Sequence, residues 1–189
     1  MTTSDLAPST ALDLAVRIQR LEDRALISER VIKYAKSIDA NDWDALAQCF
    51  TDPVHVDFSE AGLPAADFPR DQFIGFASAG LGGFTALQHL SPNHVIEFHD
   101  TDPDRAVCHS YMYAQHHLTD ADGGDFFLMR GSYTNSMLRT PGGWRIERVV
   151  QHLSWSEGNL DLPAQAAART ASGPGRANPP AEALTAAAE

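Results

Sequence analysis

Apolar and polar positions follow a helical repeat in the N-terminal part of the chain. Apolar residues recur at steps of three and four over residues 14–38, which predicts an amphipathic helix. The repeat slips near residues 22–24, so this segment is either one bent helix or two. Asp42 then stands where it can cap a second short helix over residues 43–50, and Pro69, a residue favoured at the first helical position, begins a third.

The pattern changes to strands after Gly83. Runs of Gly, Pro and Asp separate the strand candidates, as in antiparallel connections. The predicted strands after Gly83 cover residues 93–99, 105–118, 126–139 and 144–155, and residues 54–59 form an earlier strand among the helices. Helices followed by a sheet indicate an α+β fold with about five to six antiparallel strands. Because some strands exceed ten residues, the sheet must curve strongly, and with helices on one side it encloses a concave space suited to a ligand.

The two ends of the chain differ from the part between them. Residues 159–189 combine prolines with alanines and hold almost no large apolar side chains. Such a segment cannot bury enough surface to offset the entropy lost on ordering, so we expect a mobile tail or one that docks on a neighbouring subunit. Residues 1–10 are predicted to be flexible as well. The expected folded unit is a single domain over residues 11–158.

Composition and charge narrow the class of protein. The 189-residue chain is 43% hydrophobic and carries a net charge of -11, which disfavours binding to the phosphate backbone of a nucleic acid. Cys49 and Cys108 are far apart and show no secreted-type spacing, so reduced thiols are expected. No apolar run is long enough for a membrane span and no signal-peptide pattern is present, so we expect a soluble, cytoplasmic protein without a membrane partner.

The eight histidines do not form a pattern of metal ligands. Catalytic metals commonly take two histidines at i, i+4 spacing on a helix or at His-x-His spacing on a strand, and neither occurs among positions expected to share a face. His116 and His117 are adjacent, so on a strand they point to opposite sides. The chain also lacks the Gly-x-Ser-x-Gly motif of acyl-enzyme chemistry. We therefore predict neither a metal nor another cofactor.

Asp39 lies in the last turn of the first predicted helix, where the helix dipole disfavours a carboxylate by about 0.3–1 kcal/mol. One interpretation is a solvated helix end or a cap for the turn that follows. The other is a buried carboxylate that orients a histidine. Such a pair forms a general base near neutral pH, because the carboxylate fixes the imidazole tautomer and stabilises the imidazolium that forms. The local pattern leaves both interpretations open.

Several motifs together resemble the SnoaL-like branch of the nuclear-transport-factor-2-like superfamily. Over residues 21–159 the order and spacing are similar to those of scytalone dehydratase, the bile-acid dehydratase and the hexachlorocyclohexane dehydrochlorinase of that group. The motifs are Tyr34-Ala-Lys-Ser-Ile-Asp39, Leu87-Gln-His89 ahead of Asn93-His94, Gly131-Ser-Tyr-Thr-Asn135 and Gly143-Trp-Arg-Ile.

The resemblance implies a cone-shaped, curved antiparallel sheet closed by the N-terminal helices, with an Asp39–His89 pair inside. It implies that Tyr34 is a polar group that helps to polarise the substrate. His116, or His117 if the strand register slips, corresponds to a second histidine, and Asn135 to an asparagine of scytalone dehydratase. It also implies a homo-oligomer, a trimer or else a dimer.

Two positions depart from scytalone dehydratase. That enzyme has tyrosines where this chain has Ile38 and Phe58, and the lost hydroxyls make scytalone itself an unexpected substrate. Alternation along the strands offers a check that is independent of the resemblance. It groups small and apolar residues with His116 rather than with His117, although a bulge would exchange the faces. The side chains expected to contact substrate are Phe58, Met112, Phe127, Met129 and Tyr133.

The sequence therefore predicts a cofactor-independent lyase, a dehydratase acting on a small, mostly apolar hydroxy-carbonyl compound. The predicted catalytic residues are Asp39, His89, Tyr34, His116 and Asn135. An isomerase or polyketide-type cyclase is one alternative, because the same acid and base serve those reactions. A non-catalytic binding protein, or a small partner subunit of a ring hydroxylase, is the other, since one fold hosts many functions.

Overall fold

The structure, a computed structural model, describes residues 11–173. Its first helix, α1 (Ala11–Ala40), is a single helix of 30 residues, which decides between the one-helix and two-helix alternatives. The second helix, α2 (Trp43–Ala47), begins at the predicted cap, where an Asp42 side-chain oxygen accepts a hydrogen bond from the Ala45 amide. This helix is shorter than predicted because the chain enters a strand at Phe50.

The third helix, α3 (Arg70–Leu81), has Pro69 as its N-cap, one position before the site predicted for it. A short 3-10 turn, η1 (Ser59–Ala61), precedes it. Seven strands form one sheet: β1 (Phe50–Asp57), β2 (Ala65–Phe68), β3 (Ala86–Leu90), β4 (Val95–Phe98), β5 (Arg105–His117), β6 (Phe126–Thr140) and β7 (Gly143–Gly158).

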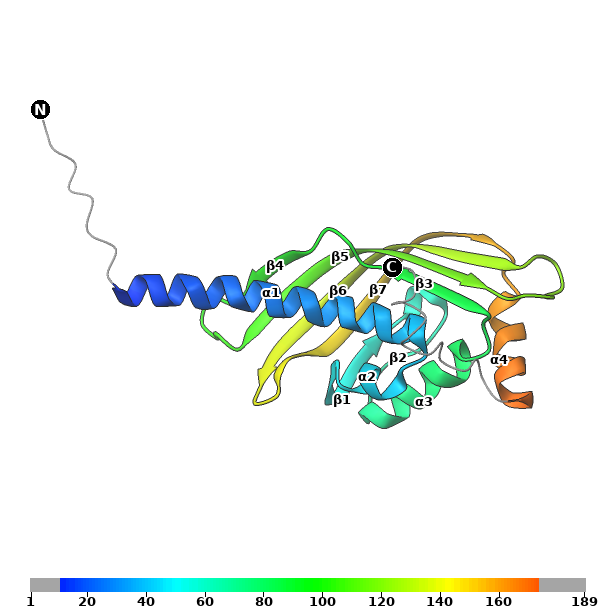
Figure 1. The fold of residues 1–189 in the computed structure, drawn as a ribbon, viewed down its shortest axis with the longest axis horizontal. Helices are drawn as coiled ribbons and strands as arrows, with labels where there is room; N and C mark the ends of the chain where they lie inside the picture. Colours follow the sequence, from blue (N-terminus) through cyan, green and yellow to red (C-terminus); the bar gives the residue numbers. More distant parts are fainter. Residues whose placement is uncertain (1–10, 174–189) are drawn as a thin grey trace, which may run out of the picture.

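The strand order is β2-β1-β7-β6-β5-β3, with β4 also paired to β5. The α+β fold with a strongly curved sheet is confirmed (Figure 1). Two details differ from the prediction. The sheet has seven strands rather than five to six, and it is not wholly antiparallel, because β1 and β7 run parallel. A parallel pair needs a long crossover, and here the rest of the sheet supplies the connection.

The two longest strands, β6 and β7, change register between Arg130 and Gly131. At this point the backbones approach closely, and a Cβ atom on Gly131 would lie 1.8 Å from the carbonyl oxygen of His152. Only glycine fits such an approach. A bulge bends and twists a strand locally, so this shift contributes to the curvature of the sheet.

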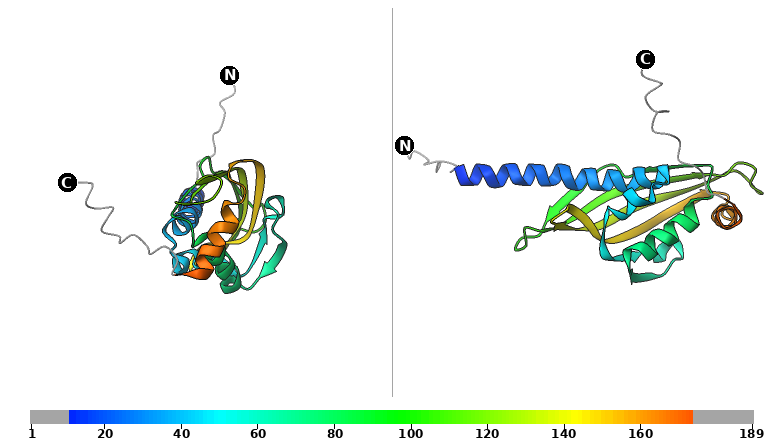
Figure 2. Two further views of the ribbon diagram at one scale, coloured as in Figure 1. Left: turned by 90° about the vertical axis from the view of Figure 1, so that its right-hand side faces the viewer. Right: turned by 60° about the horizontal axis from the view of Figure 1, so that its bottom comes forward.

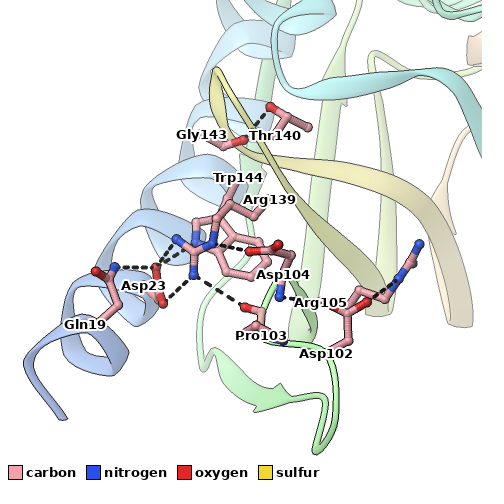
Figure 3. Close-up of polar contacts among 10 residues, drawn as sticks. All are labelled: Gln19, Asp23, Asp102, Pro103, Asp104, Arg105, Arg139, Thr140, Gly143 and Trp144. Carbon is pink, nitrogen blue, oxygen red and sulfur yellow. Dashed lines mark hydrogen bonds and ion pairs between the residues drawn. The ribbon is translucent and has the colours of Figure 1, made fainter. Parts of the chain in front are cut away.

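A buried ion pair fastens α1 to the far end of the sheet (Figure 3). Two nitrogens of Arg139 on β6 each lie 2.7 Å from a carboxylate oxygen of Asp23, and the indole N–H of Trp144 on β7 donates to the same carboxylate at 3.0 Å. The Asp23 residue is only 4% exposed. Beyond this clamp, α1 extends past the body of the molecule (Figures 1 and 2).

The segment predicted to be a tail is corrected in part. A fourth helix, α4 (Leu162–Ser172), packs against α3 at the opposite end of the molecule from the start of α1 (Figure 2). It buries Leu162 and Ala166, although Leu162 is the one large apolar residue of this helix. Small side chains allow α4 to approach the backbone of Gly83 closely, so a short helix packs without a wide apolar face. The predicted flexible segment 1–10, and residues 174–189 of the predicted tail, lie outside the described residues.

Candidate active site

The concave side of the fold holds a cavity of about 890 Å³, between the sheet and the helices α1, α2 and α3. Its wall is mostly apolar and aromatic, with contributions from η1, β2 and the start of α4. This size and lining are typical of a site for a small organic molecule. The polar side chains on the wall are Tyr34, His89, His116, Tyr133 and Gln151.

Asp39 and His89 form a close pair at this wall. The Nδ1 atom of His89 lies 2.7 Å from an Asp39 carboxylate oxygen, and the His89 backbone N–H points at both carboxylate oxygens at 3.0 Å. The pair joins the last turn of α1 to β3, a strand that the sequence did not predict. Of the two interpretations of Asp39, the structure shows the contact with a histidine, although the carboxylate is partly exposed rather than buried.

The pairing with Asp39 determines which nitrogen of His89 carries the proton. A carboxylate accepts hydrogen bonds only, so Nδ1 is the protonated nitrogen, and Nε2 carries the lone pair of a ring that lines the cavity. The His89 side chain is 9% exposed and Asp39 is 26% exposed. An imidazole in this state can remove a proton, and the adjacent carboxylate stabilises the imidazolium that results.

His116 stands beside His89, with ring centroids 5.4 Å apart and rings nearly perpendicular. It is packed between the rings of Phe84 and Phe127, and its Nδ1 lies 3.2 Å from the backbone oxygen of Phe127. Burial, and then the neighbouring His89, lower the pKa of His116 to about 4. His116 is therefore a neutral ring near pH 7.

A second polar group of the wall lies on β6, β7 and α1. The rings of Tyr34 and Tyr133 meet edge to face with centroids 6.1 Å apart, and Gln151 donates an N–H to the Tyr133 oxygen at 3.4 Å. Burial raises the pKa of Tyr34 well above its usual value and that of Tyr133 to about 12. Both tyrosines are thus protonated. Gln151 was not predicted; the available signal was a polar residue two positions after Val149, on the buried side of β7.

The structure brings most of the predicted residues together. The predicted contact residues Phe58, Phe127, Met129 and Tyr133 line the cavity, and Ile38 lines it as well. His116 is on the inner face of β5, whereas His117 faces outward, 3.7 Å from Asp125.

Met112 and Asn135 are not among the residues that line the cavity. Both are buried in the core of the sheet. The sulfur of Met112 accepts a hydrogen bond from Gln151. Neither polar atom of the Asn135 amide has a hydrogen-bond partner. The expectation that Asn135 points into the cavity is therefore not met. Asn135 lies on the same inner face of β6 as Tyr133, but beyond Tyr133 this face is packed against the core and no longer borders the cavity.

Two findings concern other kinds of site. Within residues 11–173, three or more His, Cys, Asp or Glu side chains do not gather in a way that could hold a metal ion. None of the helices in this part of the chain combines the length and the apolar character that a membrane crossing requires.

Comparison with known proteins agrees with the fold. A protein of Kribbella flavida is 33% identical, with a TM-score of 0.71 over 77% of this chain and 99% of that one. A candidate scytalone dehydratase of Novosphingobium aromaticivorans is 21% identical, with a TM-score of 0.65 over 74% and 89%. A hexachlorocyclohexane dehydrochlorinase is 17% identical, with a TM-score of 0.65 over 76% and 93%.

A sequence relative points the same way. An uncharacterized protein of Mycobacterium tuberculosis H37Rv is 26% identical over 135 residues, which are 71% of this chain and 87% of that protein. The family described as SnoaL-like domain matches residues 19–150, a range that includes α1 from the Asp23 clamp onward and nearly all of the sheet. The chain therefore belongs to the SnoaL-like domain family.

Proposed function

We propose that this protein is a cofactor-independent lyase, a dehydratase that acts on a small, mostly apolar hydroxy-carbonyl compound. The observation that carries the proposal is the 2.7 Å contact between Asp39 and His89 at the wall of an apolar cavity. A general base requires an unprotonated nitrogen close to the substrate and a partner for the charge that forms. The Nε2 atom of His89, on a ring that lines the cavity, and the Asp39 carboxylate are our candidates for these two groups.

The proposed reaction is an elimination. Nε2 of His89 takes the proton from the carbon next to the carbonyl, and the electron pair of that C–H bond forms an enolate. The enolate then collapses to a conjugated double bond, and the C–O bond of the hydroxyl group breaks. The proton held on His89 passes to the departing hydroxide, which leaves as water, so the base returns to its starting state. Asp39 stabilises the intermediate imidazolium.

His116 takes a binding role in this scheme. Its Nδ1 lies beside the backbone oxygen of Phe127, which can only accept a hydrogen bond, so Nδ1–H is the donor and Nε2 is an acceptor. An acceptor next to His89 suits the hydroxyl hydrogen of the substrate. That contact would hold the hydroxyl oxygen where it can receive the proton from His89.

The similar structures support an elimination without fixing the substrate. Two of them carry the names of a dehydratase and a dehydrochlorinase, and both names denote loss of a small molecule from adjacent carbons. At this low identity the likeness concerns the fold, so the reaction rests on the site itself. An isomerase or cyclase would use the same base but would release no water.

The test begins with neutral cyclic β-hydroxy ketones incubated with the full-length protein, with products followed by mass spectrometry. We expect a product lighter by one water molecule. His89→Ala and Asp39→Asn should each lower the rate by about 10²–10⁴-fold while the protein stays folded. The matched control is His117→Ala, which removes a histidine that faces outward beside Asp125.

Two results would contradict the proposal. One is a rate for His89→Ala or Asp39→Asn equal to that of the His117→Ala control. The other is a product of unchanged mass whose formation depends on His89, which would identify an isomerase or cyclase instead.

A further inference from the structure

We propose that Tyr133, held by Gln151 and Tyr34, is a binding subsite for a neutral carbonyl oxygen of the ligand. The inference deepens the proposed function, because it concerns the same cavity and rests on a ligand that enters it. It assigns a recognition role to a side chain of β6 that stands apart from the His89 and His116 pair. It also defines the class of ligand as uncharged.

The orientation of the Gln151 amide follows from its two neighbours. The Nε2 atom lies 3.1 Å from the sulfur of Met112 and 3.4 Å from the hydroxyl oxygen of Tyr133. A thioether sulfur only accepts hydrogen bonds, so the nitrogen of the amide must be on this side. The Tyr133 oxygen consequently accepts a hydrogen bond from Gln151.

The ring of Tyr34 packs edge to face against that of Tyr133, with ring centroids 6.1 Å apart. Because its oxygen accepts the hydrogen bond from Gln151, Tyr133 keeps its own proton for another partner. Within the described part of the chain, no acceptor for that proton is found, and the side chain lines the cavity. The partner is therefore an acceptor atom of the ligand.

The two polar groups of the cavity have opposite hydrogen-bonding character. His89 and His116 each use Nδ1–H on the protein, so both offer an acceptor nitrogen to the ligand. Tyr133 offers a donor. His89 on β3 pairs with Ala114 on β5, and Ala114 pairs with Met129 on β6. Tyr133 lies four residues after Met129, and four residues span about 13 Å along a strand. A ligand that satisfies both groups presents hydrogens at one end and an oxygen at the other, and this oxygen is distinct from the carbonyl next to the carbon that His89 deprotonates in the proposed reaction.

The wall of the cavity also limits the charge of the ligand. Among the described residues that line it, none is Lys, Arg, Asp or Glu. A carboxylate or phosphate buried there would lack a cationic partner, and the cost of leaving water would not be offset. A ketone oxygen requires only a neutral donor such as Tyr133. The subsite therefore favours uncharged carbonyl compounds over their acidic analogues.

Three naphthalene derivatives of similar shape test this subsite by calorimetric titration of the full-length protein. They are 2-acetylnaphthalene, 2-ethylnaphthalene, which lacks the oxygen, and 2-naphthoate, which is charged. We expect the ketone to bind about 3- to 10-fold more tightly than the hydrocarbon, as one neutral hydrogen bond allows, and 2-naphthoate to bind most weakly. Tyr133→Phe should abolish the preference for the ketone.

Two further variants make the result specific. Tyr113→Phe is the matched control, because Tyr113 lies on the opposite face of the sheet and its hydroxyl bonds Gln115. It should leave the ketone preference unchanged. Gln151→Leu keeps the Tyr133 ring and removes a donor to its oxygen, and it should reduce the preference. Thermal unfolding of each variant verifies that the fold is intact.

A direct readout is the infrared C=O band of bound 2-acetylnaphthalene. In the wild type this band should lie at lower wavenumber than that of the ketone in an apolar solvent. In Tyr133→Phe it should return to the apolar-solvent position. Equal binding of ketone and hydrocarbon by the wild type, or a ketone preference that survives in Tyr133→Phe, would overturn the subsite. Tighter binding of 2-naphthoate would overturn the neutral ligand class.

The outcome is separable from that of the proposed function. His89→Ala should keep the ketone preference while it loses turnover. If turnover never depends on His89 but the preference still depends on Tyr133, the dehydratase proposal fails and the subsite stands. If turnover depends on His89 but Tyr133→Phe leaves the preference for the ketone unchanged, the subsite proposal is wrong and the dehydratase proposal stands.

Discussion

His116 is bound through its Nδ1 atom to the backbone oxygen of Phe127, 3.2 Å away on the neighbouring strand. Because a carbonyl oxygen cannot donate, this contact fixes the ring as the tautomer protonated on Nδ1. In the proposed elimination, His116 would therefore accept a hydrogen bond from the substrate and would not donate a proton. The proposal accordingly assigns the role of the acid to protonated His89.

The first prediction is that His116 stays neutral well below pH 6. Its pKa is lowered from 6.5 to about 4, mainly by burial. In the unfolded chain the same ring takes up a proton near pH 6.5, so the unfolded state binds more protons between pH 6.5 and 4. The folded protein is therefore destabilised as the pH falls from 6.5 to 4. The free energy of unfolding should decrease over this range by on the order of 3 kcal/mol in total because of His116. Urea unfolding from pH 7 to pH 4 measures the loss.

The matched variants isolate the contribution of His116. His116→Gln removes the titrating ring and should flatten this part of the pH dependence. His117→Gln, at the adjacent outward-facing position, should retain it. A ring of His116 that titrates near pH 6.5 in an NMR experiment on the folded protein would contradict the prediction.

The second prediction concerns the two cysteines. Cys49 and Cys108 are buried free thiols, and burial raises the pKa of Cys108 to about 11. A thiol reagent attacks the thiolate, which is scarce and inaccessible here. We expect the thiol reagent dithiobis(nitrobenzoate) to react with the two cysteines of the folded protein only as fast as the protein unfolds. In concentrated guanidinium chloride, where the chain is unfolded, the same cysteines should react rapidly. Ser154→Cys, which places a thiol at an exposed position, should react at once. A fast reaction of the native wild type would show that either thiol is accessible.

Part of the site could be predicted because strand alternation is a strong signal. On β5 it separated His116 from His117 correctly, since a long strand with one buried face leaves little choice of register. On β6 the same rule put Tyr133 and Asn135 on one inner face, as observed. It could not tell that the cavity ends at Tyr133, because where a cavity ends depends on which helix covers the sheet.

Other features carried no local signal. β3 holds His89 but is only five residues long, and it forms by pairing with β5. β2 is an edge strand that pairs only with β1. α4 lacks a wide apolar stripe, so composition favoured a tail. In each case contacts with distant parts of the chain, rather than local propensity, stabilise the element.

The third prediction tests the packing of α4. A Cβ atom on Gly83 would lie 1.9 Å from the backbone oxygen of Ala166 on α4, so Gly83→Ala must displace that helix. We expect it to cost about 1–3 kcal/mol, the usual range for overpacking, and to increase hydrogen exchange in α4. Gly75→Ala is the control, since nothing lies within 4 Å of its added methyl group. There alanine should stabilise α3 by about 0.5–1 kcal/mol. Equal stability of the two variants would show that α4 does not rest on Gly83.

The last prediction concerns the clamp between α1 and the sheet. Asp23 is buried and receives hydrogen bonds from Arg139 and Trp144, whereas Asp104, the other carboxylate on Arg139, is 56% exposed. Asp23→Ala should cost about 3 kcal/mol, because it leaves the guanidinium and the indole N–H without their buried acceptor. Asp104→Ala removes a surface ion pair and should cost less than about 1 kcal/mol.

The pH dependence of the clamp gives an independent check. Burial raises the pKa of Asp23, but hydrogen bonds from Arg139, Trp144 and Gln19 outweigh it, and the pKa is lowered overall. A carboxyl group with a lowered pKa contributes stability above its unfolded value, near 3.9, and loses it as the pH falls through the folded value. Wild type and Asp23→Ala should therefore differ most at neutral pH and converge under strongly acidic conditions. Urea unfolding measures both variants, and equal costs for Asp23→Ala and Asp104→Ala would show that burial of the pair does not fasten α1.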